Sequence, residues 1–252
     1  MCYNTELTDS QWQYIAGKLQ DKRKRKHSLR SVWNAIAYLV RSGCQWRLLP
    51  GEYPPWQSVY YYFSQWCKSG VYEEIMADLN IRERRCKGRK DEPSLGIIDS
   101  QSVKTSSKTE IRGYDAGKKV AGRKRHLVVD TLGLILAVVV HAADLSDRQA
   151  APQVLERTRK DYPSVRDFLA DSVYNGPQLG AWLQQHNCRL QIVQKKVSEK
   201  GFVILPKRWI VERTFGWFNR YRRLAKDYEV QTDCSVAMLQ LSMIARLLKK
   251  LF

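Results

Sequence analysis

Apolar residues in the first eighty positions recur three or four residues apart, which is the spacing of an amphipathic helix. Glycines and prolines divide this pattern into three expected helices, at 7–19, 29–43 and 54–70. A run of lysine and arginine at 22–26 lies between the first two. Short helices with a basic segment are typical of a helix-turn-helix-like DNA-binding domain. We therefore expect an all-helical N-terminal domain over residues 1–80 and a basic linker over 81–93.

Beyond residue 93 the pattern changes to short, β-branched apolar runs that alternate with helical stretches. The expected strands are 95–99, 125–133, 134–144, 167–171 and 188–193. The expected helices are 146–162, 175–187 and 206–224. Three strands followed by alternating helices and strands are the element order of an RNase H-like fold. The sequence thus predicts an α/β domain over residues 94–252, with a mixed five-stranded sheet flanked by helices.

Two of the expected strands end in an aspartate. Asp99 follows the apolar run at 95–98, and Asp171 follows the apolar run at 168–170. The first and fourth strands are adjacent and parallel in the predicted sheet, so the two carboxylates would lie side by side. Carboxylates at that distance repel each other unless a cation lies between them. The sequence therefore predicts a divalent cation at this point of the sheet.

Glu212 supplies a third acid, on a helix otherwise rich in cations and aromatic rings. Three carboxylates are the minimum set that holds two Mg²⁺ ions roughly 3.5 to 4 Å apart, one to activate a water and one to stabilise a leaving 3′ oxygen. We expect Asp99, Asp171 and Glu212 to be both the catalytic residues and the metal ligands. Mn²⁺ is expected to substitute for Mg²⁺.

Each acid also has a simpler interpretation. Either aspartate alone is more often a turn or cap residue, and Glu212 alone is more often paired with Arg208 or Arg213 on the surface. Other candidate acids, which we rank below the three, are Asp130, Asp144, Asp147 and Asp167. The joint position of Asp99, Asp171 and Glu212 on the expected elements favours these three acids.

The balance of charge indicates a polyanionic partner. The chain has 43 lysines and arginines against 25 acids, a formal net charge of +18 that exceeds what solubility requires. Nucleic acid is the expected partner, and the hairpin at 113–126 and the helix at 206–224 carry cations suited to phosphates. The expected DNA-binding residues are Lys118, Lys119, Arg123, Lys124, Arg125, Arg208, Arg213, Arg220, Arg222 and Arg223. The longest apolar stretch is too short for a membrane span, and six scattered cysteines without a C-x-x-C pair favour a reducing cytoplasm.

Several motifs, in order, resemble the insertion-sequence DDE transposases, and among them the insertion sequence five family. They include "CQWRLLPGEYPPWQSVYYYFSQW", "IIDSQSVKT", "LADSVYNG" and "FVILPKRWIVERTFGW". The resemblance implies that Asp99, Asp171 and Glu212 form the metal-binding triad, and Arg208 matches the arginine of a related Y-R-E-K signature. The chain departs from that signature at Leu205 and at Asn219, which leaves the adjacent Arg220 as the candidate for the role of the signature's lysine. It also has Val173 where relatives have glycine.

The resemblance further implies a substrate and a reaction. The substrate would be the inverted repeats that end a mobile element, cleaved to a 3′-OH that then attacks target DNA. A homodimer or larger assembly on DNA is expected, in the bacterial cytoplasm and associated with the nucleoid. Two alternatives remain open: a nuclease of the same fold that cuts without joining, and a catalytically idle DNA-binding repressor.

Overall fold

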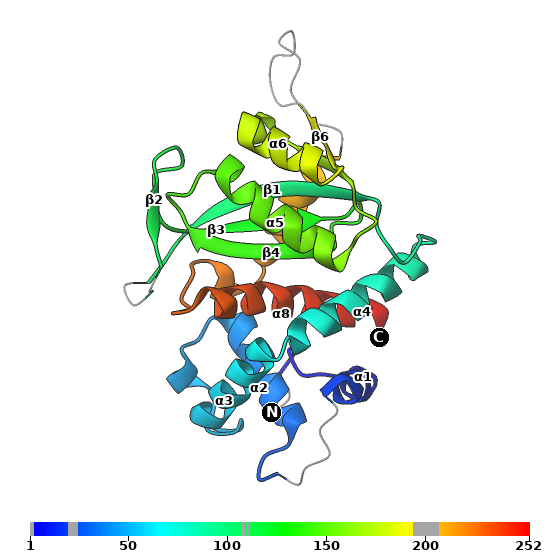
Figure 1. The fold of residues 1–252 in the computed structure, drawn as a ribbon. Helices are drawn as coiled ribbons and strands as arrows, with labels where there is room; N and C mark the ends of the chain where they lie inside the picture. The colour runs from blue at the N-terminus through cyan, green and yellow to red at the C-terminus, as the bar shows by residue number, and fades with distance from the viewer. Residues whose placement is uncertain (1–2, 20–24, 107–108, 110, 194–206) are drawn as a thin grey trace. The chain divides into compact units, whose positions relative to one another are not determined.

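The computed structural model in Figure 1 describes residues 3–19, 25–106, 109, 111–193 and 207–252. It divides the chain into two compact units. A helical unit consists of the chain up to Glu83 together with Phe218–Ala225 and Asp233–Phe252, and an α/β unit consists of Arg84–Trp217 and Lys226–Thr232. The helical unit is therefore not confined to residues 1–80, because the end of the chain joins it. No helix in the described ranges is long and apolar enough to cross a membrane.

Four helices and most of a fifth form the helical unit. They are α1 (Asp9–Leu19), α2 (Leu29–Ser42), α3 (Trp56–Lys68), α8 (Thr232–Leu251) and most of α4 (Val71–Cys86). Helix α2 begins where the Ser28 hydroxyl accepts from the Ser31 N–H, and it ends at Gly43, whose φ of +74° suits glycine. Helix α8 joins the unit through the Gln11 side chain, which donates to the Leu248 carbonyl at 3.2 Å.

The first three helices agree with the sequence prediction, but α4 was not predicted. Its first turns bury Tyr72, Ile75, Met76 and Leu79, which have helical spacing. Residues 82–86, expected to begin a basic linker, form its last turn instead. The basic run at 22–26 lies partly outside the described residues.

A mixed six-stranded sheet forms the centre of the α/β unit. Its strands are β1 (Leu95–Lys104), β2 (Gly113–Asp115), β3 (Val120–Val129), β4 (Ile135–Ala142), β5 (Asp167–Ala170) and β6 (Arg189–Ile192). They run in the order β2-β3-β1-β5-β6, and β4 also pairs with β3. The pairs β1–β5 and β5–β6 are parallel, whereas the pairs of β3 with β1, β2 and β4 are antiparallel. The architecture is thus α/β, as expected, with one more strand than the five predicted.

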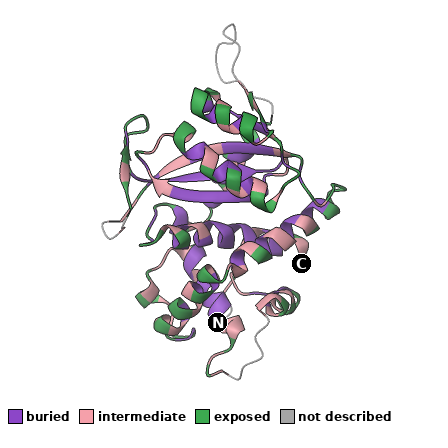
Figure 2. Cartoon of the chain, viewed as in Figure 1, coloured by how far each residue is buried: buried purple, intermediate pink, exposed green. Residues whose placement is uncertain are grey.

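Helices cover both faces of this sheet. On one face, α5 (Asp147–Asp161) and α6 (Pro177–Gln185) bury an apolar core that includes Ile98, Val128 and Phe168. On the other lies α7 (Trp209–Phe218), where the Thr214 hydroxyl donates to the Gly133 carbonyl at 3.0 Å. Figure 2 shows the central strands as buried between these layers. We call the two sides the α7 face and the α5 face.

Two boundaries differ from the prediction in ways that affect the site. Strand β1 does not end at Asp99 but continues to Lys104, because residues 99–104 pair with the antiparallel β3. The helix predicted over 206–224 ends at Phe218, and a separate 3-10 turn follows at Arg222–Leu224. Residue 206, its predicted start, lies outside the described residues.

Candidate active site

The pairing of β1 with β5 brings two of the predicted acids together. Ile97 pairs with Leu169 in this parallel ladder, and Asp99 and Asp171 each lie two residues further along. Because side chains alternate along a strand, Asp99 leaves the sheet on the side of Ile97, away from the α5 core that holds Ile98. Asp171 follows the last residue of β5, and its carboxylate accepts from the Val173 N–H at 3.0 Å to cap a 3-10 turn, Ser172–Tyr174. Asp171 is therefore a cap residue as well as a neighbour of Asp99.

Asp99 is a carboxyl group in an unfavourable place for a negative charge. Its side chain is 18% exposed. Burial, with the nearby Asp171 carboxylate adding to it, raises the pKa of Asp99 to about 6, although the Ser100 N–H at 2.7 Å and the cations Arg208 and Lys118 oppose the shift. The two acids therefore repel each other across β1 and β5, and their ionised forms favour a bound cation.

Arg208 connects the third acid to the first. Its Nη1 lies 3.8 Å from Asp99 Oδ2, and its Nη2 lies 2.5 Å from Oε1 of Glu212, which lies four residues along the chain in α7. The alternative ion pair of Glu212 with Arg208 is thus present, but the same guanidinium also reaches Asp99. Within the described ranges, no three His, Cys, Asp or Glu side chains are arranged to hold a metal ion. Asp99 and Glu212 share an arginine instead.

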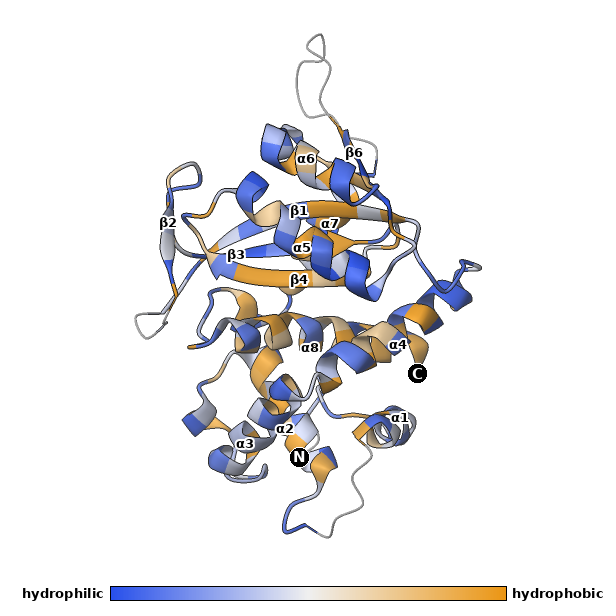
Figure 3. Ribbon diagram, in the orientation of Figure 1, coloured by the Kyte–Doolittle hydropathy of each residue, from blue (hydrophilic) through white to orange (hydrophobic). Residues whose placement is uncertain are grey.

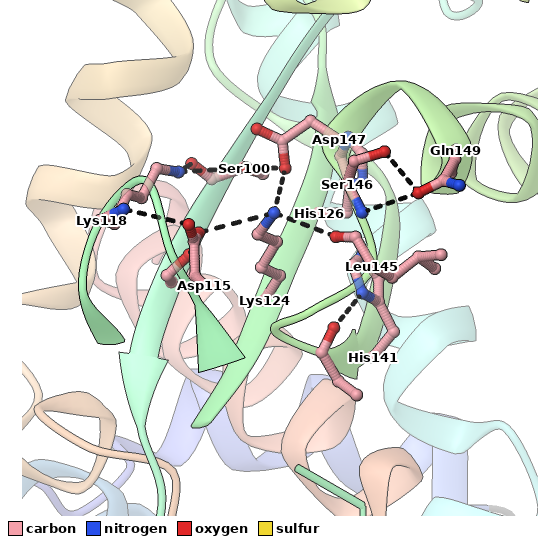
Figure 4. Close-up of polar contacts among 12 residues, drawn as sticks. Ser100, Asp115, Lys118, Lys124, His126, His141, Leu145, Ser146, Asp147 and Gln149 are labelled. Atoms are coloured by element: carbon pink, nitrogen blue, oxygen red, sulfur yellow. Dashed lines mark hydrogen bonds and ion pairs between the residues drawn. The ribbon is translucent and has the colours of Figure 1, made fainter. Parts of the chain in front are cut away.

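A second cluster of charges lies at the same level on the α5 face (Figure 4). Lys124 Nζ is 3.0 Å from Asp147 Oδ1 and 3.5 Å from Asp115 Oδ2. Ser100 Oγ donates to Asp147 Oδ1 at 2.8 Å, and Lys118 Nζ donates to the Ser100 carbonyl at 3.2 Å. Lys118, a predicted DNA-binding residue, is exposed. Its contact with Ser100 holds it next to the residue that follows Asp99.

Three of the other predicted DNA-binding residues are not on the surface. Arg123, Lys124 and Arg125 are 0%, 5% and 2% exposed. The segment was expected to be a hairpin whose cations contact phosphates, but it forms part of β3 between β1 and β4, so its side chains enter the layers on both faces. Figure 3 shows a hydrophilic stretch of β3 beside the hydrophobic β4. Arg123, for example, donates to the carbonyls of Glu229 and Val230 at 2.9 and 2.6 Å. The expectation of phosphate contacts by these three is therefore corrected.

The remaining predicted cations divide between the two units. Lys119 is exposed in the β2–β3 turn, with a φ of +52°. Arg213 stacks between the rings of Trp209 and Trp217, 4.7 and 5.0 Å from their centroids, which indicates a packing role. Arg220 and Arg222 are exposed and Arg223 is buried, where it donates to the Cys44 carbonyl at 3.3 Å, and all three belong to the helical unit.

Three competing acids have other roles. Asp130 accepts from the N–H groups of Leu132 and Leu134 in the β3–β4 turn and pairs with Arg84. Asp167 pairs with Arg189 at 2.6 Å on the surface, and Asp147 belongs to the cluster around Lys124. Two buried polar residues on the α5 face, Ser100 and His126, were not among the predicted site residues. A signal was present, because Ser100 and Ser102 interrupt an apolar strand at alternate positions.

Two acids on adjacent strands with a third on a covering helix are an arrangement suited to metal-assisted phosphodiester chemistry. Comparison with known proteins identifies the family. Residues 90–248 match the family model described as "Transposase DDE domain", and residues 7–76 match "Putative transposase of IS4/5 family". The first match spans more than half of the sequence, so this chain belongs to the DDE transposase family.

Two curated relatives are similar to part of this chain, and the first is named as a transposase. A putative transposase for insertion sequence element IS402 from Burkholderia cepacia is 28% identical over 127 residues, which are 48% of this chain and 60% of the relative. An uncharacterized protein, y4sN, from Sinorhizobium fredii is 30% identical over 77 residues, which are 29% of this chain and 62% of the relative. The matched region thus spans about three fifths of the length of each relative.

Proposed function

We propose that this protein is a transposase that cleaves DNA at the inverted-repeat ends of an insertion sequence and transfers the resulting 3′-OH into target DNA. The α/β unit would be an RNase H-like catalytic domain. The observation that carries the proposal is that Asp99 lies beside Asp171 on adjacent parallel strands and shares Arg208 with Glu212. Family membership supports the same activity.

The donor set fits divalent metal ions. All three groups are carboxylates, the oxygen ligands that Mg²⁺ and Mn²⁺ prefer. The mutual repulsion of Asp99 and Asp171 favours a cation near both. Asp99, Asp171 and Glu212 would hold two Mg²⁺ ions, which when bound lower the pKa of an attacking water and stabilise a leaving 3′ oxygen. For Glu212 to join such a set, Arg208 must give up its contact with this carboxylate.

The chain's own cations would orient the DNA. Lys118 and Lys119 lie on the exposed turn of the β2–β3 hairpin, and the contact of Lys118 with Ser100 brings its ammonium close to Asp99. Arg208 would exchange its two carboxylates for a phosphate, since a guanidinium binds both groups in the same way. In the helical unit, the exposed Arg220 and Arg222 are further candidates for phosphate contacts. We propose a homodimer or larger assembly, because two element ends have to be joined.

A strand-transfer assay tests this function. The purified protein is incubated with Mg²⁺, a duplex that carries an element end and a supercoiled target plasmid, and joined products are separated on a gel. We expect wild type to join the two DNAs and the variant Asp99→Asn to do neither cleavage nor joining. Asp91→Asn is the matched control, because Asp91 makes an exposed ion pair with Arg85 and should retain full activity.

The outcomes separate the alternatives. Cleavage without any joined product would favour a nuclease. DNA binding without metal-dependent cleavage by the wild type would favour a repressor. Joining that persists in Asp99→Asn would refute the assignment of the acids.

A further inference from the structure

The α5 face of the sheet changes character at the level of the catalytic acids. Up to Ile98 and its partner Val128, this face is an apolar core. The next residues on the same face are Ser100 and its partner His126, which are 7% and 0% exposed. Buried polar groups are costly unless they are hydrogen-bonded, so a polar pair at this depth calls for an explanation.

His126 makes one such bond, to a tyrosine from another part of the chain. Its Nε2 lies 2.7 Å from the hydroxyl of Tyr174, which is 1% exposed. The two rings are 5.5 Å apart between centroids. This contact joins β3 to the 3-10 turn that follows β5.

That turn is the one that carries Asp171. Asp171 caps it with its side chain, and the Tyr174 N–H donates to the Asp171 carbonyl at 3.3 Å. Ser172, Val173 and Asn175 are exposed, so Tyr174 is the residue that anchors the turn in the interior. The short, hydrogen-bonded loop leaves little freedom between the anchor and the acid.

The departure from relatives at Val173 is consistent with this arrangement. Val173 is 53% exposed, and it is absent from the residues with positive φ. The turn therefore accepts a β-branched residue without backbone strain. Its position depends on the side chain of Tyr174 rather than on a glycine.

We propose that Tyr174 and His126 are positioning residues, whose buried hydrogen bond fixes the turn after β5 and thereby holds the Asp171 carboxylate beside Asp99 for metal binding. This inference rests on the proposed function of the acids. In this role neither residue would need to contact DNA or metal. A phenylalanine at position 174 would fill the same space, but nothing would then orient the ring toward His126.

Metal affinity without DNA tests the inference. Mn²⁺ alone is titrated into the full chain, and free Mn²⁺ is followed by electron paramagnetic resonance. Since supporting groups around metal ligands typically contribute 10- to 100-fold to affinity, we expect Tyr174→Phe to weaken Mn²⁺ binding about tenfold. His126→Phe should weaken Mn²⁺ binding in the same direction, and the double variant should be no weaker than Tyr174→Phe alone, because Tyr174→Phe already removes the bond to His126.

Two controls separate positioning from general stability. Tyr72→Phe makes the same chemical change at a fully buried tyrosine of the helical unit, whose hydroxyl has no hydrogen-bond partner among the residues that the structure describes. This variant should leave Mn²⁺ affinity unchanged. His126→Gln retains a polar group toward Tyr174 and should keep affinity within about threefold of wild type, whether or not Tyr174→Phe folds well.

The results also distinguish this inference from the function on which it rests. If Asp171→Asn loses Mn²⁺ binding but Tyr174→Phe and His126→Phe bind like wild type, the positioning role is refuted and the metal site stands. If Asp171→Asn binds Mn²⁺ like wild type, both are refuted. If His126→Gln is as defective as His126→Phe, the hydrogen bond is not what matters and the inference fails.

Discussion

Two buried carboxylates, Asp99 and Asp147, lie at the same level on opposite faces of the sheet, but they differ in how completely they are partnered. On the α7 face, Asp99 is 18% exposed, and Arg208 Nη1 lies 3.8 Å from its Oδ2. On the α5 face, Asp147 is 12% exposed and has Lys124 at 3.0 Å and the Ser100 hydroxyl at 2.8 Å. The two acids are similarly buried, but only Asp147 is fully partnered.

The pKa values follow this difference. Burial opposes the ionisation of Asp147, but hydrogen bonds from Ser100 and Lys124 outweigh it and hold its pKa below the usual range. Burial and Asp171 raise the pKa of Asp99 to about 6. The charge of Asp147 is thus balanced within the protein, whereas that of Asp99 at the candidate site is not. This contrast leads to five predictions.

The largest effect should follow from loss of Asp99. Asp99→Asn should lower the rate of metal-dependent strand cleavage by at least about 1,000-fold, because it removes a metal ligand and several kcal/mol of transition-state stabilisation. The free energy of unfolding should stay the same or rise, since a poorly compensated buried charge is lost. Cleavage rates and urea denaturation measure the two quantities. A variant that is inactive because it is unfolded would contradict the prediction.

Lys124 should behave in the opposite way. Lys124→Met leaves Asp115 and Asp147 buried without their shared cation, and we expect it to lower the free energy of unfolding by about 3 kcal/mol. Urea denaturation measures this loss. Lys119→Met is the matched control on the exposed turn and should change stability by less than about 0.5 kcal/mol.

For DNA binding we expect the larger effect from Lys119→Met and the smaller one from Lys124→Met, the reverse of their effects on stability. Removal of one phosphate contact reduces the salt dependence of binding, so Lys119→Met should lower the slope of log K against log salt by about 1. Lys124→Met should leave that slope unchanged. A lower slope for Lys124→Met alone would restore Lys124 as a phosphate ligand.

The fourth effect is a dependence of stability on pH. Burial lowers the pKa of His126 to about 3, so the folded state binds a proton much more weakly than the unfolded state, whose histidine has a pKa near 6.5. The stability that depends on neutral His126 is complete above about pH 6.5 and is lost as the pH falls. Between pH 7 and pH 5, wild type should lose about 2 kcal/mol relative to His126→Gln.

The comparison of wild type with His126→Gln removes the contribution of the other titrating groups to the change in stability. Asp99 acts in the opposite direction, since a raised folded pKa makes the fold more stable as the pH falls below 6, but it is present in both proteins. The charged and titratable groups near His126 are also common to both: His141, Asp147, Lys124, Lys118 and Tyr174. Equal loss of stability in the two proteins would show that His126 is not held neutral by burial.

The sequence was informative about elements and less so about neighbours. The apolar runs before Asp99 and Asp171 predicted the strands, and the α/β order of elements followed from their spacing. The spacing of Tyr72, Ile75 and Leu79 was also sufficient to predict α4, but the basic composition that follows led to the interpretation as a linker. Local periodicity therefore accounts for most of the fold.

The partners of charged residues could not be predicted in this way. Lys124 is a surface residue by local pattern, and it becomes a buried one because Asp115 and Asp147 approach it through strand pairing and helix packing. The contact of Arg208 with Asp99 joins residues more than a hundred positions apart. Such contacts depend on the register of the sheet, which short sequence windows do not specify.

The smallest effect concerns Arg208, the cation that contacts both Asp99 and Glu212 on the α7 face. If Arg208 competes with metal for Asp99 and Glu212, Arg208→Gln should raise Mn²⁺ affinity in the absence of DNA by about threefold, the scale of a partly exposed ion pair. Arg189→Gln breaks an exposed ion pair with Asp167 and should have no effect.

Addition of duplex DNA should then tighten Mn²⁺ binding in wild type more than in Arg208→Gln, because phosphates draw the guanidinium away from the carboxylates. Weaker Mn²⁺ binding by Arg208→Gln would mean that the arginine supports the acids rather than competing for them, and the contrast between the two faces would then be smaller than we infer.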